Sequence, residues 1–221
     1  MEKSPASAQI EHCLEVIDMN ECCRDNFDAY VDIISGEVRN VLGNIEYKNI
    51  EKAADIIRRA QLSGRRVHIS GIGKPSHIAT YAASLLSSTG TPTYYLHGTE
   101  AVHGSCGQLV PGDSVIFISN SGETAEMKAT VLAVKNNNCR VIGISKSDNS
   151  WLAGQSEVHL KACVEIEGGP LNLAPRASVI AELIVLQALS VVLQTEVDVT
   201  PTQYVKWHPG GTLGKLRCGE V

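Results

Sequence analysis

Two short polar strings, each directly after an apolar run, carry the residues best suited to chemistry in this chain. The run Val67–Ser70 leads into Gly71-Ile72-Gly73-Lys74, and Val115–Ile118 leads into Ser119-Asn120-Ser121-Gly122-Glu123-Thr124. A helical pattern follows each string at once. Backbone N–H groups and the positive end of a helix bind phosphate, and small side chains let the anion come close. The two strings therefore predict a site for a small phosphorylated ligand.

The second string suggests a division of roles. We expect the hydroxyl groups of Ser119, Ser121 and Thr124 to donate hydrogen bonds to the phosphate, and Gly122 to allow its close approach. Serine, asparagine and glycine also form ordinary turns and helix caps, and that role explains one or two of these residues. A whole run of them after a buried strand favours phosphate binding.

Lys74 stands at a predicted helix start, where a cation opposes the helix dipole. A bound anion or an adjacent carboxylate would favour it there. The string is not a Walker A loop, and after Gly73 it lacks the third glycine of a dinucleotide fingerprint. No acidic residue ends the strand predicted over Thr93–Leu96. We therefore expect Gly73 and Lys74 to face a small ligand, without a nucleotide cofactor.

A pair of histidines flanks a carboxylate in the middle of the chain. Helical spacing predicts Glu100 and His103 on one face of a short helix, with His97 just before it. Glu100 could orient the imidazole or share a metal with it. Only Cys106 lies at zinc-like spacing from these residues, so we expect no required metal.

Two further candidates come late in the chain. Glu167 precedes Gly168-Gly169-Pro170 in a rigid loop, which could equally be an ordinary turn. His208 precedes Pro-Gly-Gly close to the C-terminus, where it stabilises no obvious element. Because histidine suits proton transfer near neutral pH, function or subunit docking explains His208 better.

Composition limits the classes of partner. The 221 residues carry a formal net charge of -5, which argues against nucleic acid and against an anionic membrane. The seven cysteines are scattered without a C-x-x-C pair, as is typical of reduced thiols. The N-terminus lacks an apolar signal core, and we expect no window near the ~20 apolar residues of a membrane span. These features predict a cytoplasmic protein.

The elements that would position the candidate residues change character at Arg66. Residues from about 7 to 62 show helical spacing of apolar side chains, with Gly43 and Gly64 as helix stops. Strands are then predicted at Val67–Ser70, Thr93–Leu96, Ser114–Ser119, Arg140–Ser145 and Val158–Leu160. Helices are predicted at Ser76–Ser88, Thr124–Asn136 and Ala177–Thr195. This alternation predicts an α/β fold, with a parallel sheet covered on both faces and ligands outside the carboxyl ends of its strands.

Taken together, the motifs resemble the sugar isomerase (SIS) domain family and, within it, the D-arabinose-5-phosphate isomerases. The resemblance covers residues from about 30 to 217. The matching strings are Gly-Ile-Gly-Lys (71–74), Ser-Thr-Gly-Thr-Pro (88–92), His-Gly-Thr-Glu-Ala-Val-His-Gly (97–104), Ile-Ser-Asn-Ser-Gly-Glu-Thr (118–124), Glu-Gly-Gly-Pro-Leu-Asn-Leu-Ala-Pro (167–175) and His-Pro-Gly-Gly-Thr-Leu-Gly (208–214). Ser-Asn-Ser-Gly-Glu marks only the broad family, whereas the last two strings point to the arabinose-phosphate branch.

The resemblance implies a three-layer sandwich with a five-stranded parallel sheet flanked by helices, in a single SIS domain over residues 1–221. Its parts would be a helical segment (1–62) and a sheet core with the C-terminal segment (66–217). It also implies a homo-oligomer, usually a tetramer. The activity it implies is the interconversion of D-ribulose 5-phosphate and D-arabinose 5-phosphate, without a cofactor. That reaction is the first step toward the Kdo sugar of Gram-negative lipopolysaccharide.

The resemblance also implies roles for individual residues. The lysine, two glutamates and histidine that surround the substrate in the family match Lys74, Glu123, Glu167 and His208. Residues that the family places beside the sugar match His97, His103, Gly90 and Thr91.

Three features depart from the family pattern. Full-length members typically continue into a pair of CBS modules, whereas this chain stops at Val221, so we expect a stand-alone catalytic domain. The family often has His-Gly-Asp-Leu-Gly at residues 103–107, where Ser105 and Cys106 stand here, so a carboxylate near a site histidine is missing. Arg176 begins a segment that is often rich in Thr and Ser, and it adds a cation.

The residues leave the proton-transfer base open between His208 and Glu167. We expect Lys74 to polarise the oxygen that becomes negative, His103 to assist ring opening, and Glu123 to position a hydroxyl or orient Lys74. His103 and His208 flank the core and could reach a neighbour's site.

Two other functions fit the same loops. One is a non-catalytic phosphosugar-binding regulator, and the other is an isomerase of another sugar phosphate. A regulator needs the phosphate loop but not the proton-transfer residues Lys74, Glu167 and His208 together. A regulator that acts on DNA would usually carry a fused helix-turn-helix.

Overall fold

The computed structural model describes residues 5–210, with side chains from residue 19 onward, around a central parallel sheet. Its strands are β1 (Val67–Gly71), β2 (Thr93–Tyr95), β3 (Ser114–Ile118), β4 (Arg140–Ser145) and β5 (Val158–Lys161). The five strands lie in the order β2-β1-β3-β4-β5, and each neighbouring pair is parallel. Every residue of β1 and β3 is buried, because helices cover both faces of a parallel sheet. Each predicted strand is confirmed to within one residue at either end.

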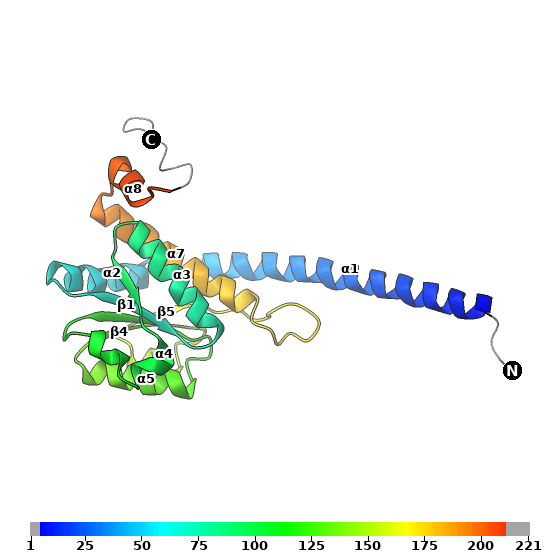
Figure 1. Cartoon of the computed structure of the whole chain (residues 1–221), viewed down its shortest axis with the longest axis horizontal. Helices are drawn as coiled ribbons and strands as arrows, with labels where there is room; N and C mark the ends of the chain where they lie inside the picture. The colour runs from blue at the N-terminus through cyan, green and yellow to red at the C-terminus, as the bar shows by residue number, and fades with distance from the viewer. Residues whose placement is uncertain (1–4, 211–221) are drawn as a thin grey trace.

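Helices form a layer on each face of the sheet (Figure 1). One layer contains α1 (Pro5–Asn44), α2 (Tyr47–Leu62), α3 (Lys74–Ser88) and α7 (Ala177–Val197). The other contains α4 (Gly98–Ala101), the 3₁₀ turn η1 (Ser105–Gln108), α5 (Ala125–Asn136) and α6 (Trp151–Gln155). Alternate residues of β3 supply the two cores, with Ile116 in the first and Phe117 in the second. The three-layer sandwich with a five-stranded parallel sheet is therefore confirmed.

The predicted N-terminal helical stretch consists of two helices, separated by Ile45 and Glu46. The second, α2, buries one apolar stripe against the sheet (Ile50, Ala53, Ala54, Ile56, Ile57 and Ala60). The first, α1, extends away from the sheet as a single long helix (Figure 1). On the described part of this extension, the apolar side chains of Met19 and Phe27 are 67% and 63% exposed. Such side chains would lose water contact if another chain packed there.

Helix α7 corrects one expectation from the sequence. By length and composition it could span a membrane, since an 18-residue window has a mean hydropathy of 1.9. The expectation that no such window exists was therefore wrong. Half of that window is buried inside the fold, and Leu186, Leu189 and Leu193 belong to the core against the sheet. The apolar composition of α7 is that of a core helix.

A short helix that was not predicted, α8 (Pro201–Trp207), follows α7. Its start is fixed by a capping box: Gln203 N–H donates to the Thr200 hydroxyl, and Thr200 N–H donates to the Gln203 side chain. His208 ends the helix. Residues 211–214 of the matching C-terminal string lie outside the described residues.

Candidate functional site

Two helices without side-chain caps begin at neighbouring strand ends. Helix α3 starts at Lys74 directly after β1, and α5 starts at Ala125 after the loop that follows β3. Strands β1 and β3 are paired along their whole length, so both helix starts lie at the same place on the carboxyl edge. The residues before them, Gly73 and Thr124, make no side-chain cap hydrogen bond. In α3, Pro75 has no N–H and the Ser76 N–H donates to the Gly73 carbonyl (3.0 Å), so the open first-turn N–H groups lie mainly on α5. Together with the positive ends of both helices, they favour an anion between the two helix starts.

The loop Ser119–Thr124, here called the phosphate loop, holds its shape through its own hydroxyl groups. The Ser119 hydroxyl accepts a hydrogen bond from Gly122 N–H (3.2 Å), and the Ser121 hydroxyl accepts one from Glu123 N–H (3.2 Å). The hydroxyl oxygens of Ser119 and Thr124 are 3.5 Å apart. Gly122 has φ +68°, a conformation that other residues rarely adopt. The structure brings the four predicted phosphate-binding residues together, and their role in binding stays a prediction.

Lys74 is exposed at the first position of α3. Within the described part of the chain, its ammonium group forms no hydrogen bond or ion pair. Of the two explanations for a cation at this position, an adjacent carboxylate is therefore not found there. An anion bound between the helix starts remains the explanation.

Glu123 has partners other than the expected one. Its Oε2 accepts from Lys128 Nζ (2.6 Å), and its Oε1 accepts from the backbone N–H of Trp151 (2.7 Å). These hydrogen bonds, that of Lys128 first, lower the pKa of the Glu123 carboxyl group. The Lys128 ammonium group also lies 5.5 Å from the centre of the Trp151 ring. The structure therefore assigns Glu123 to holding the phosphate loop against α6, and it does not support the idea that Glu123 orients Lys74.

Glu167 lies in the loop between β5 and α7, where its carboxylate accepts hydrogen bonds at the N-terminus of α7. Its Oε2 accepts from the backbone N–H groups of Arg176 (2.7 Å) and Ser178 (3.1 Å). Helices α3 and α7 lie side by side, joined by the 3.4 Å hydrogen bond from Gln187 to the Tyr81 hydroxyl. Both helices begin at the carboxyl edge, so Lys74 and Glu167 stand at neighbouring helix starts.

Glu182 is a buried acid that was not among the candidates predicted from the sequence, and it lies on α7 one turn after Ser178. It is 1% exposed, and its Oε2 has no hydrogen-bond partner within the described residues. Burial, with a smaller contribution from the charge of Glu167, raises the pKa of Glu182 to about 8. Glu182 is the one acid between Ala177 and Thr195, a mostly apolar stretch, and this was the sequence signal for the residue.

His97 and His103 border the carboxyl end of β2. His97 Nδ1 accepts the backbone N–H of Glu100 (3.3 Å) and so caps the short helix α4, which leaves Nε2 to carry the proton. His97 also lines a shallow cavity of about 380 Å³ with Tyr95, Gly104, Ser105 and Gln108.

His103 and Glu100 do not share one helical face as expected, because α4 ends at Ala101. His103 lies in the turn that follows, where its N–H donates to the carbonyl of Glu100. Among the described residues, no group of three or more His, Cys, Asp and Glu side chains could hold a metal ion.

Gly90, Thr91 and His208 lie at the opposite edge of the sheet from the other candidates. Gly90 and Thr91 follow α3 and precede β2, so they stand at the amino ends of the strands, and Thr91 is fully buried. A Cβ on Gly90 would lie 3.7 Å from the Trp207 ring, which places the residue before His208 at this same edge. His208 stacks on Tyr204, with ring centres 4.1 Å apart. One subunit therefore does not bring these three residues together with Lys74, Glu123 and Glu167.

A larger cavity of about 490 Å³ lies between α1, α2 and β5, and it contains none of the predicted site residues. Half of its lining residues carry a carboxylate or amide group, among them Glu46, Asn49 and Glu165, against a single lysine, Lys161. This composition suits an anion poorly, so the two helix starts remain the better phosphate site.

A family model described as the SIS domain matches residues 62–192. The chain is 41% identical over 154 residues to a Haemophilus influenzae protein named probable arabinose 5-phosphate isomerase, over 69% of this chain and 46% of that protein. It is 36% identical over 179 residues to the Francisella tularensis arabinose 5-phosphate isomerase KdsD, over 81% of this chain and 55% of that protein. The chain thus spans about half the length of the curated relatives it matches.

A solved structure matches over nearly its full length. It is an Escherichia coli CFT073 protein in complex with arabinose 5-phosphate, and the TM-score is 0.76 at 32% sequence identity. The match covers 86% of this chain and 99% of that chain.

Proposed function

The chain belongs to the SIS domain family, and on that premise we propose that it is an aldose–ketose isomerase interconverting D-ribulose 5-phosphate and D-arabinose 5-phosphate. The observation that carries the proposal is the pair of uncapped helix starts, α3 and α5, at the ends of neighbouring strands β1 and β3. This arrangement suits the phosphate of such a sugar. The named relatives and the arabinose 5-phosphate complex support the choice of sugar.

The reaction requires a proton to leave C1 of the ketose and another to reach C2, through an enediolate intermediate. The phosphate loop would hold the phosphate, with hydroxyl groups from Ser119, Ser121 and Thr124. Lys74, which has no partner within the described residues, would stabilise the oxygen that becomes negative. Glu167 or His208 would carry the proton. His97, which lines the 380 Å³ cavity at the end of β2, would contact the sugar, and His103 would assist ring opening.

The positions of His208, Gly90 and Thr91 favour a site shared between subunits. They lie at the amino edge of the sheet, whereas Lys74 and Glu167 lie at the carboxyl edge. A site that contains all of them needs two copies of the chain. We therefore propose that the chain forms a homo-oligomer, and specifically a tetramer. The exposed apolar side chains of Met19 and Phe27 on α1 are consistent with a subunit interface.

The proposed activity implies a cellular role. Arabinose 5-phosphate is the precursor of Kdo, so the protein would act in lipopolysaccharide biosynthesis in the cytoplasm. We propose the whole chain as one catalytic SIS domain, with residues 1–62 as its helical part and 66–217 as its sheet core and C-terminal segment.

The direct test is proton NMR of purified protein with D-ribulose 5-phosphate. We expect arabinose 5-phosphate to appear, and we expect turnover to be lost in His208→Ala while the fold, checked by circular dichroism, is kept. Wild-type turnover in His208→Ala would contradict its catalytic role.

Thermal stabilisation by sugar phosphates without turnover would favour a phosphosugar-binding regulator. Turnover of a different sugar phosphate alone would correct the substrate.

A further inference from the structure

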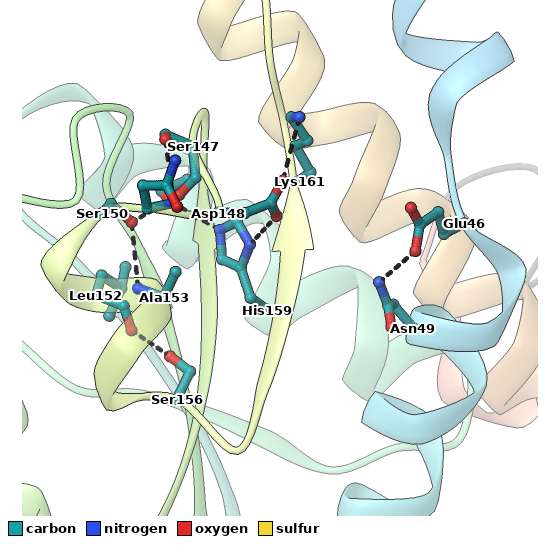
Figure 2. A network of polar contacts seen from close by, with 12 residues as sticks. Glu46, Asn49, Ser147, Asp148, Ser150, Leu152, Ala153, Ser156, His159 and Lys161 are labelled. Atoms are coloured by element: carbon teal, nitrogen blue, oxygen red, sulfur yellow. Dashed lines mark hydrogen bonds and ion pairs between the residues drawn. The ribbon is translucent and has the colours of Figure 1, made fainter.

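A chain of polar contacts runs from the surface of β5 to the start of α6 (Figure 2). Lys161 Nζ lies 3.1 Å from Asp148 Oδ2, and Asp148 Oδ1 lies 2.9 Å from His159 Nδ1. His159 Nε2 then lies 2.8 Å from the Ser145 hydroxyl, which lies 2.8 Å from the Ser150 hydroxyl. We call these five residues the relay. They come from β4, β5 and the loop between β4 and α6.

Only one direction of proton donation satisfies the whole relay when His159 is neutral. A carboxylate can only accept, so His159 Nδ1–H donates to Asp148 and Nε2 is left as an acceptor. Ser145 O–H therefore donates to Nε2, and Ser150 O–H donates to Ser145. The oxygen of Ser150 then accepts the backbone N–H of Ala153 (3.2 Å), which caps α6. The Ser145 hydroxyl also lies 3.2 Å from the carbonyl oxygen of Ser147, a longer contact than its 2.8 Å contacts within the relay.

Asp148 is held ionised at the outer end of the relay. Partial burial opposes its charge, but the hydrogen bonds from Lys161 and His159 outweigh that effect and lower the pKa of Asp148. An ionised Asp148 keeps the proton of His159 on Nδ1.

The inner end of the relay lies against the phosphate loop. A Cβ on Gly122 would lie 2.6 Å from both the Cβ and the hydroxyl oxygen of Ser150, so the two residues are in close contact. Leu152 N–H donates to the Gly122 carbonyl (3.1 Å), and Trp151 N–H donates to Glu123 (2.7 Å). Ser150 caps the first turn of α6. The backbone N–H groups of that turn therefore bind the phosphate loop at the Gly122 carbonyl and at the Glu123 side chain.

Asp148, His159 and Ser145 are connected in the order of a nucleophilic triad, but a substrate has no access to the serine. Ser145 is fully buried, and its hydroxyl group is enclosed by His159 and Ser150. No substrate carbonyl could reach it. The arrangement is suited to fixing positions.

We propose that His159 is a positioning residue for phosphate binding. It joins Asp148 to Ser145, and Ser145 in turn holds Ser150. Ser150 then fixes the first turn of α6, and that turn fixes the phosphate loop. This inference rests on the proposed function, because it assigns the phosphate of the substrate to that loop. It concerns residues outside the loop itself.

The test compares His159→Ala with wild type in two assays: isomerase kinetics with D-ribulose 5-phosphate, and binding of inorganic phosphate by calorimetry. Since a phosphate contact serves substrate and transition state alike, KM and the Kd of phosphate should rise together while kcat changes little. The expected rise is about fivefold, the effect of losing roughly one hydrogen bond. His159→Gln, whose amide can reach Ser145, should restore both values most of the way.

Ser156→Ala is the matched control, because the Ser156 hydroxyl binds the Leu152 carbonyl on the same short helix but lies outside the relay (Figure 2). Unchanged KM and phosphate affinity in a folded His159→Ala variant would overturn the proposal, as would an equal loss in Ser156→Ala. Should His159→Ala fail to fold, Ser145→Ala breaks the same link and carries the test. If wild type binds phosphate without isomerising the sugar, the proposed function fails, while weaker phosphate binding in His159→Ala still supports the positioning role.

Discussion

Glu182 is a carboxyl group enclosed on the sheet side of α7, and its protonation couples folding to pH. Because its pKa rises from 4.5 to about 8 on folding, the folded chain keeps a proton that the unfolded chain releases between those values. The free energy of unfolding should therefore fall as pH rises from 4.5 to 8, and Glu182 should contribute no further slope outside that window. The lost stability is the cost of ionising an acid that lacks a partner among the described residues.

Replacing Glu182 by glutamine should remove this slope. We expect Glu182→Gln to be more stable than wild type at pH 8.5 by a larger margin than at pH 5, in urea unfolding followed by circular dichroism. Glu51→Gln, at an exposed position of α2, is the control and should shift stability equally at both pH values. The same pH dependence in Glu182→Gln and wild type would show that Glu182 is charged in the folded protein.

At the scale of elements, the phosphate loop and α6 form one unit, and Gly122 is where they meet. An alanine at this position would need φ near +68° and would place its Cβ 2.6 Å from Ser150. A left-handed conformation alone costs about 1–2 kcal/mol for an L residue. Gly122→Ala should therefore displace the loop and weaken phosphate binding by more than about tenfold.

The measurement for Gly122→Ala is calorimetry with inorganic phosphate, together with Tm. Gly154→Ala is the control, since Gly154 lies within α6 with no atom within 4 Å of an added Cβ. It should keep wild-type affinity, because alanine is favoured over glycine in a helix. Wild-type affinity in Gly122→Ala would mean that the loop adapts to the side chain.

At the scale of the whole molecule, the two edges of the sheet divide the proposed catalytic residues. Lys74 begins α3 at the carboxyl edge, whereas His208 ends α8, whose Trp207 lies near Gly90 at the amino edge. If both serve one reaction, each active site combines two subunits. Two inactive variants should then complement each other.

Co-expression of Lys74→Ala with His208→Ala tests this arrangement. Random assortment of equal amounts should leave about a quarter of the sites with both wild-type residues, and activity should return to that level. Lys74→Ala with Ser119→Ala is the control, because both residues lie at the carboxyl edge of one subunit and should not complement. No activity in the first mixture, with oligomers present by light scattering, would contradict a shared site.

The sequence by itself determined the sheet and the loops at its carboxyl edge. Strands such as Val115–Ile118 are buried on both faces, so their apolar runs are continuous, and small polar residues directly after them mark the loops before helices. These are local patterns, and they predicted each strand and the position of Lys74, Glu123 and the phosphate loop. The roles proposed for these residues rest on resemblance and await the tests above.

Only the tertiary structure decided which side chains meet. Glu123 binds Trp151 N–H, and Glu37 accepts the backbone N–H of Ile166, 129 residues away in the chain. Contacts of this kind depend on how helices pack on the sheet, and spacing along the chain does not encode them. For the same reason the separation of His208 from Lys74, and the burial of Glu182 against the core, became visible only when α7 and α8 were placed in the fold.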